Sequence, residues 1–385
     1  MRRPRPIRDF LAREGVRFTE GNRVEIYEDG ASGIAAMLAA IGGAQKRIHL
    51  ETYIFRSDAT GRRFVEALEA RARAGVAVRV LYDALGSLSI DTAMFRGLRA
   101  AGGQVVAFNP WRRFYPRWLP RRRDHRKVLV VDGTVGFVGG LNIGDEYDKG
   151  PHDGTGFWRD THLALRGPAV RDLEAVFLES WFRADAPNLP WTALLSDEPA
   201  VCGDVRCAIV PDGPVYRRRM MRDLFLIGLY GSTRQVDLTS PYFAPDRRVM
   251  RALGVVSARG VKVSLILAGY TDHPILRRAS RNLIPRLSAT GVEVYEHHTS
   301  MLHAKSAVFD NRWVLVGTSN LDRQSFEHSY EVNVILEGGA VAARLQAMFD
   351  RDRDRSTRVD ERMLARRGLL ERLLDRLSAV ILRFI

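Results

Sequence analysis

The feature that most constrains the fold of this chain is a short motif that occurs twice. The spacing His-x-Lys-x4-Asp appears at residues 125–132 and again, 178 residues later, at residues 303–310. With nine histidines and five lysines in 385 residues, chance predicts about 0.1 occurrences of His-x-Lys. The repeat therefore indicates a duplicated domain. The motif residues are His125, Lys127, Asp132, His303, Lys305 and Asp310.

Weaker similarities on both sides of the motif extend the duplication. Residues 47–55 resemble residues 235–243, and residues 74–80 resemble residues 259–265. Because these landmarks come in the same order in both halves, we predict a tandem duplication of a domain of about 150 residues. The predicted parts are an N-terminal extension (1–20), a first domain (21–184), a Pro-rich linker (185–205), a second domain (206–350) and a C-terminal tail (351–385).

Each half alternates helical and strand patterns, which predicts an α/β fold. Residues 64–70 have the helical period, whereas residues 76–81 form a β-branched run. In each motif copy, two apolar runs flank a hairpin turn at residues 132–133 or 310–311. Side chains two residues apart on a strand point to one face, so each His and Lys should face the same spot. The Asp at each turn is expected to pin the hairpin or to pair with a basic group.

Histidine, lysine and asparagine side chains that converge from two halves are suited to a phosphate site. A lysine ammonium neutralises non-bridging phosphate oxygens as a compact charge. Asn142 and Asn320 end the Gly-containing loop after each motif, and they can donate to the same oxygens or cap the next helix. Fixed donors aimed at developing charge are the main electrostatic contribution to phosphoryl chemistry. The alternative is that duplication copied an inert histidine.

The charge balance favours a polyanionic partner. The net charge is +14 and the pI is about 10.2, which fits nucleic acid or an anionic membrane surface. No apolar run approaches the ~18 residues that span a bilayer, and no secretory signal follows the basic start. The chain has two cysteines, Cys202 and Cys207, which is too few for a disulfide framework or a four-ligand zinc site. We therefore expect reduced thiols in a cytoplasmic compartment. No residue cluster suits a metal, and we expect no metal or cofactor.

The paired motifs, each followed by a Gly-rich loop that ends in Asn, resemble those of the phospholipase D superfamily. Within it, residues 50–55, 158–162 and 302–305 are similar to bacterial cardiolipin synthases, and the similarity covers about residues 20–350. The resemblance implies two tandem phospholipase D-like domains related by pseudo-two-fold symmetry. Each would be a mixed sheet flanked by helices, with the active site at their interface.

The resemblance also implies a mechanism. One histidine attacks phosphorus to form a phosphohistidine, and the other protonates the departing alkoxide and later deprotonates the incoming alcohol. By analogy His125 is the nucleophile and His303 the general acid/base, although sequence symmetry alone does not decide that order. Carboxylates that fix the histidine tautomers are expected at Glu331, 28 residues after His303, and at its first-half counterpart Asp160, 35 residues after His125.

Two further segments favour a membrane surface. Residues 111–127 hold eight basic, one acidic and four aromatic side chains. This composition suits headgroup-level membrane contact, stacking on single-stranded nucleic acid, or a solvated basic loop. In residues 366–384, apolar side chains recur at helical spacing and arginines occupy the other face. That pattern is typical of an interfacial anchor, with packing on the protein's own core as the alternative.

Together these features predict a cardiolipin-synthase-like phosphatidyltransferase. It would move a phosphatidyl group from phosphatidylglycerol to the alcohol of a second phospholipid, while attached peripherally to the cytoplasmic side of the cell membrane. Its expected partners are phospholipid substrates and an anionic membrane surface, and nucleic acid is not expected. One alternative is a hydrolase of the same superfamily, acting on lipid or nucleic acid, and another is a binding protein without catalysis.

Overall fold

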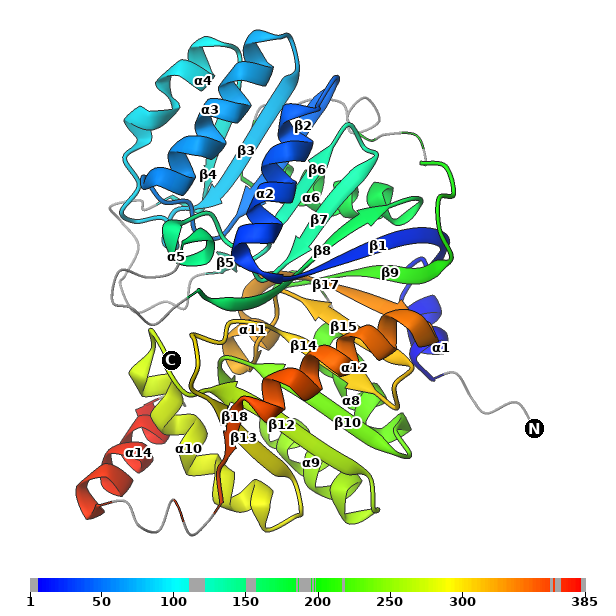
Figure 1. Cartoon of the computed structure of the whole chain (residues 1–385), viewed down its shortest axis with the longest axis vertical. Helices are drawn as coiled ribbons and strands as arrows, with labels where there is room; N and C mark the ends of the chain where they lie inside the picture. Colours follow the sequence, from blue (N-terminus) through cyan, green and yellow to red (C-terminus); the bar gives the residue numbers. More distant parts are fainter. Residues whose placement is uncertain are drawn as a thin grey trace.

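The computed structural model describes residues 6–110, 122–149, 157–184, 186, 195, 197, 199–216, 219–360, 363 and 368–381. Within these residues, one mixed sheet runs through both halves and helices flank it (Figure 1). Most of the predicted linker and of the basic, aromatic segment at 111–127 lie outside the described residues, so those two predictions stay predictions.

The first half has a parallel part and an antiparallel part in its sheet. The strand order is β1-β8-β7-β6-β2-β3-β4, in which β2, β3 and β4 are parallel neighbours and the other pairs are antiparallel. The strands are β1 (Thr19–Asp29), β2 (Arg47–Thr52), β3 (Ala77–Asp83), β4 (Gln104–Phe108), β6 (Val128–Val131), β7 (Val135–Gly139) and β8 (Arg159–Arg166). The helices are α2 (Gly30–Gly42), α3 (Ala59–Arg73), η1 (Thr92–Phe95), α4 (Arg96–Ala100), α5 (Asp145–Asp148) and α6 (Ala169–Arg183).

The second half repeats this order as β9-β17-β15-β14-β10-β12-β13, with β18 added at the edge. The strands are β9 (Val205–Asp212), β10 (Gln235–Ser240), β12 (Lys262–Ala268), β13 (Glu293–His297), β14 (Ser306–Phe309), β15 (Trp313–Gly317), β17 (Ser329–Glu337) and β18 (Ser356–Arg358). The helices are α8 (Met220–Gly231), α9 (Arg247–Ala258), α10 (Pro274–Ser288), α11 (Arg323–Glu327), α12 (Gly339–Asp354) and α14 (Leu369–Ile381). A short parallel pair joins β11 (Phe243–Ala244) to β16 (Leu321–Asp322). The predicted α/β fold of two tandem phospholipase D-like domains is confirmed.

The two halves are joined by backbone pairing and by a shared core. Strands β1 and β9 pair antiparallel, with Thr19 opposite Cys207. Strands β7 and β8 also contact β15 and β17, although these are not neighbours in the sheet. Side chains such as Val138 and Leu163 therefore share one apolar cluster with Val316 and Val334. This packing fixes one half against the other and so fixes the geometry of any site between them.

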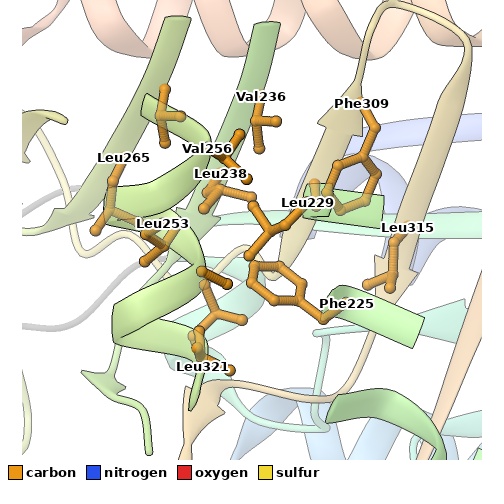
Figure 2. Close-up of a cluster of buried hydrophobic side chains, with 14 of the residues drawn as sticks. Phe225, Leu229, Val236, Leu238, Leu253, Val256, Leu265, Phe309, Leu315 and Leu321 are labelled. Carbon is orange, nitrogen blue, oxygen red and sulfur yellow. The ribbon is translucent and has the colours of Figure 1, made fainter. Parts of the chain in front are cut away.

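The largest apolar cluster belongs to the second half (Figure 2). In it, Phe225 and Leu229 of α8 pack with side chains from α9, β10, β14 and β15. The helix α1 (Pro6–Arg13) adds Ile7 and Leu11 to the same cluster. Helix α1, which lies in the segment predicted as an N-terminal extension, thus contributes to the second half's core.

The C-terminal helix α14 packs beside α10 (Figure 1). Among the side chains of α14 that the structure describes, the buried ones are the polar Asp375 and Ser378, whereas Leu373, Leu374 and Leu377 are exposed. The sequence offered two alternatives for this segment, an interfacial anchor and packing on the protein's own core. Neither describes the arrangement fully, because the helix does pack on the protein but these three leucines stay exposed. Among the described residues, no helix combines the length and apolar character needed to cross a bilayer.

Candidate active site

The two motif histidines line a single cavity of about 350 Å³ between the halves. The cavity takes its walls from loops, strands and helices of both halves, as expected for a site made by duplication. From the first half come Tyr53, Ile54, Leu85, Arg123, His125, Asn142 and Tyr147, and from the second come Tyr242, Ala244, Asp272, His273, Leu276, His303, Asn320, Asp322, Arg323, Gln324, Ser325, Ser329 and Glu331.

A strand of the opposite half holds each motif histidine in place. His125 follows β5 (Arg123–Asp124), which pairs in parallel with the start of β17, and the His125 amide donates to the Tyr330 carbonyl at 2.9 Å. The His303 amide donates to the carbonyl of Arg159, the first residue of β8, at 2.7 Å. Each His and Lys therefore precedes strand β6 or β14, and the prediction that they lie on the strand is wrong. The backbone at each motif histidine is bonded instead to a strand of the other half.

The carboxylates predicted to orient the histidines do contact them, but across the halves. Glu331 places Oε1 and Oε2 at 3.1 and 3.0 Å from His125 Nδ1, and Asp160 places Oδ2 at 2.7 Å from His303 Nδ1. Pairing by sequence order, Glu331 with His303 and Asp160 with His125, is thus wrong. When Nδ1–H donates to a carboxylate, Nε2 keeps its lone pair. Nε2 is therefore the atom with which the imidazole can act as a nucleophile or a base. Each motif histidine therefore takes its orienting carboxylate from the other half.

Burial and neighbouring charges set the protonation of the site. Burial, together with Lys305, lowers the pKa of His303 to about 4, and burial also lowers the pKa of His125 against the opposing effect of Glu331. Burial alone would raise the pKa of Asp160 and Glu331, but the histidines and lysines beside them lower it overall. At neutral pH the free site therefore holds neutral imidazoles on ionised carboxylates.

The two motif lysines are buried beside their histidines. Lys127 Nζ donates to the His125 carbonyl at 2.8 Å, and Lys305 Nζ donates to the His303 carbonyl at 2.5 Å. Burial lowers the pKa of Lys127 to about 7 and that of Lys305 to about 8. An anion in the cavity favours the charged form of both ammoniums. Neither ammonium is among the groups that line the cavity, so the lysines can act on a bound phosphate group as nearby buried charges and not as direct wall contacts.

The two asparagines line the cavity and do not cap the next helix. Asn142 accepts from the Ile54 amide at 3.1 Å and donates to the Tyr147 hydroxyl at 2.6 Å. The cap positions belong instead to Gly144 for α5 and Asp322 for α11. Asn320 has a buried Oδ1 without a hydrogen-bond partner among the described residues. The capping alternative is therefore wrong for both residues.

The motif aspartates lie at the hairpin turns and are not among the residues that line the cavity, so the structure offers no contact for the catalytic role that the shared motif would give them. Asp132 adopts φ +54° and accepts hydrogen bonds from the amides of Gln45, Lys46 and Arg47. Asp310 adopts φ +52° and accepts from the three equivalent amides before β10. A short polar side chain tolerates this left-handed conformation and ties the turn to the neighbouring strand. Both aspartates pin their hairpins, as the turn pattern indicated.

Several residues around the motif histidines and their carboxylates were not selected from the sequence. The Tyr53 ring lies edge-on to His125 with centroids 5.0 Å apart, and the Tyr147 and Trp158 rings lie 5.6 and 5.5 Å from His303. Thr318 donates to Glu331 from the loop that follows β15. Tyr53 and Thr318 both lie in the repeated segments, so the repeat itself was a signal that could have found them.

The fold and this cavity define a duplicated phospholipase D-like enzyme. The family profile described as "Cardiolipin synthase, PLD-like domain" matches residues 37–163 and again residues 227–353. The chain is 34% identical over 361 residues to a cardiolipin synthase of Alkalihalophilus pseudofirmus and 35% identical over 365 residues to one of Geobacillus kaustophilus. Each alignment covers 94% of this chain and 72% of the relative. The chain belongs to the cardiolipin synthase family of the phospholipase D superfamily and is a phosphatidyltransferase of that type.

Solved structures support the fold independently. The phosphatidylserine synthase of Haemophilus influenzae matches with a TM-score of 0.75 over 99% of this chain and 98% of that chain, at 14% identity. A polyphosphate kinase of Porphyromonas gingivalis matches with a TM-score of 0.58 over 94% of this chain and 53% of that chain, at 13% identity. At such low identity the likeness extends to the fold alone.

Proposed function

We propose that this enzyme makes cardiolipin-type lipids by transferring a phosphatidyl group from phosphatidylglycerol to the hydroxyl of a second phospholipid. The observation that carries the proposal is the pair of imidazoles in one cavity, each oriented by a carboxylate from the other half. Two such imidazoles can serve as nucleophile and as general acid/base on one phosphorus. The curated relatives named as cardiolipin synthases supply the substrate class.

In the first step His125 Nε2 attacks phosphorus and the bond from phosphorus to the glycerol oxygen breaks. His303 gives its proton to that oxygen, so glycerol leaves neutral and a phosphatidyl-histidine remains. In the second step His303 takes the proton of the acceptor hydroxyl, whose oxygen attacks phosphorus while the nitrogen–phosphorus bond breaks. Lys127 and Lys305 offset the charge of the phosphoryl oxygens.

The order of the two roles is part of the proposal. His125 has 14% of its side chain exposed, whereas His303 has 5% exposed. The more open imidazole suits the one that forms and releases a bulky adduct. The pKa of about 4 at His303 belongs to the free cavity, and a bound phosphodiester anion raises it toward the range that a general acid needs.

Purified protein with phosphatidylglycerol vesicles and a chelator tests the activity. We expect cardiolipin and glycerol in equal amounts by mass spectrometry, and no cardiolipin with His125→Ala. Phosphatidic acid as the sole product would instead favour the lipid hydrolase, and cleavage of single-stranded DNA would favour the nuclease.

We further propose that the enzyme attaches peripherally to the cytoplasmic face of an anionic membrane, with α14 as the contact. Asp375 lies 3.8 Å from Arg278 of α10, so the polar side of α14 faces the protein. Leu373, Leu374 and Leu377 have 52, 37 and 49% of their surface exposed and can enter the acyl boundary. The net charge of +14 adds attraction to an anionic leaflet.

Vesicle flotation tests this attachment. Replacing the three leucines by serine should release most of the protein from phosphatidylglycerol vesicles. Val201→Ser is the matched control, because Val201 is 70% exposed on the segment before β9. Unchanged flotation of the triple variant would contradict the role of α14. Protease digestion of intact and everted membrane vesicles reports on which side of the membrane the enzyme is attached.

A further inference from the structure

The cavity wall on the His303 side carries a carboxylate that the proposed chemistry does not use. Asp272 lies in the segment between β12 and α10 and lines the cavity with 40% of its side chain exposed. Its Oδ1 accepts from the Tyr242 hydroxyl at 2.5 Å, and its Oδ2 lies 3.5 Å from His273 Nε2. Tyr242 in turn is edge-on to His303, with ring centroids 6.4 Å apart.

The sign of this charge is unexpected in a phosphate cavity. A carboxylate repels a phosphodiester, because the two groups carry charges of the same sign. Among the described residues, no lysine or arginine lies within ion-pair distance of Asp272, so its charge is not neutralised in that way. The carboxylate therefore suits a part of the substrate that donates hydrogen bonds and carries no negative charge.

The first half has no such group at the equivalent place. There, the loop after β3 presents Leu85 to the cavity, and Asp83 is fully buried with Arg123 at 3.5 Å. The asymmetry puts this exposed carboxylate on the His303 side and an apolar side chain, Leu85, at the equivalent place in the first half. In the proposed mechanism, the His303 side is the side on which the alcohol leaves and enters.

We infer that Asp272, held by Tyr242, forms a headgroup subsite that accepts hydrogen bonds from the hydroxyl groups of a polyol such as the glycerol headgroup. This inference rests on the proposed function, because it assigns the alcohol side of that reaction. Asp272 then selects alcohols that carry a further hydroxyl over alcohols that carry none. It distinguishes substrates and is not required for the bond-making steps.

Competition between soluble alcohols tests the subsite. Phosphatidylglycerol vesicles are incubated with the enzyme and with equal concentrations of glycerol and 1-propanol. The glycerol is labelled, so that its exchange into phosphatidylglycerol can be measured. The amounts of labelled phosphatidylglycerol and of phosphatidylpropanol are then compared. We expect Asp272→Asn to lower the glycerol-to-propanol ratio by about 10- to 100-fold, the factor that one hydrogen bond to a charged group supplies. Because the ratio is internal to one reaction, partial unfolding of the variant does not change it.

Tyr242→Phe is the control for the orientation of Asp272, since it removes the hydrogen bond from Tyr242 to Asp272 but leaves the carboxylate and its charge. It should retain most of the preference for glycerol. An equal loss in both variants, or an unchanged ratio in Asp272→Asn, would overturn the inference. If Asp272→Asn loses more transfer to ethanolamine than to glycerol, the subsite binds an ammonium headgroup. That result would also overturn the inference.

The same variant separates this inference from the proposed function. If the wild-type enzyme transfers to no alcohol, the proposed transfer fails, and the subsite is then tested on hydrolysis of phosphatidylglycerol against phosphatidylpropanol. A selective loss of phosphatidylglycerol hydrolysis in Asp272→Asn would still support the subsite. Equal losses on both lipids would contradict it.

Discussion

The two halves of this enzyme share a backbone plan and differ in what surrounds their histidines. Both have the same strand order, the same hairpin with a left-handed Asp at its turn, and a lysine bonded to the carbonyl of its own motif histidine. Around His125 the carboxylate is a glutamate that also accepts from Thr318. Around His303 it is an aspartate, and a Cβ at Gly140 would lie 1.9 Å from Asp160 Oδ1.

This difference teaches how one motif can supply two chemical roles. The longer Glu331 reaches a partly exposed imidazole, whereas Asp160 sits tightly under a nearly buried one. The cavity walls differ in the same direction, with Leu85 on one side and Asp272 on the other. Because each carboxylate crosses to the other half, the halves can diverge in environment while remaining dependent on each other.

The largest expected effect separates the two histidines by their leaving group. His125→Ala and His303→Ala should each lower transfer from phosphatidylglycerol by about 10³-fold or more, as for other groups that act as one unit. A phosphatidyl donor with p-nitrophenol as leaving group needs no general acid, so His303→Ala should recover much of its release rate and His125→Ala should not. The release of p-nitrophenol is followed by absorbance. Equal recovery in both variants would contradict the assigned order of roles.

Removing the charge of the crossing carboxylates should have the next largest effect. Asp160→Asn and Glu331→Gln should each lower kcat by about 10- to 100-fold, because the imidazole loses its fixed tautomer. Steady-state kinetics in detergent micelles measures this effect, with thermal unfolding to check the fold. Glu28→Gln, at a surface ion pair with Arg351, is the control and should stay near the wild-type rate. Activity within twofold of wild type would exclude a positioning role for that carboxylate.

The sequence predicted the elements of this site better than their connections. Spacing and turn chemistry are local, so the motifs, the hairpins and the alternating strands could be identified from the chain alone. The pairing of His125 with Glu331 is a long-range contact, and counting along the chain favoured the wrong partner. Asp272 belongs to no repeated segment, so no sequence signal separated it from other loop aspartates. The pattern of α14 defined two faces but not which of them would be buried.

A smaller effect should distinguish the two lysines by pH. Sulfate keeps a constant charge from pH 6 to 9, and its binding favours the protonated ammoniums. Its affinity should fall as the pH rises through about 7 for Lys127 and about 8 for Lys305, by up to about tenfold per pH unit for each proton lost. Calorimetric titration in two buffers measures affinity and proton uptake together.

Methionine variants assign the two inflections in that pH profile. Lys127→Met should remove the lower one and Lys305→Met the higher one, and Lys46→Met, at an exposed position, should change neither. A profile that stays flat to pH 9 in the wild-type enzyme would show that both lysines keep their charge in the free cavity.

The smallest effect on activity is expected at the turn aspartates, where the halves are most alike. Asp132→Ala or Asp310→Ala leaves backbone amides without an acceptor, so each should lower the free energy of unfolding by about 1–3 kcal/mol in urea titrations. Hydrogen bonds from the amides before β10 outweigh burial and hold the pKa of Asp310 below its ordinary value. Its stabilising contribution is therefore present at neutral pH and lost as the pH falls below about 4, and Asp310→Ala should remove that acid sensitivity. Because neither side chain lines the cavity, the rate per folded molecule should stay within about threefold of wild type. A loss of activity as large as that of the histidine variants would instead show that these aspartates take part in catalysis.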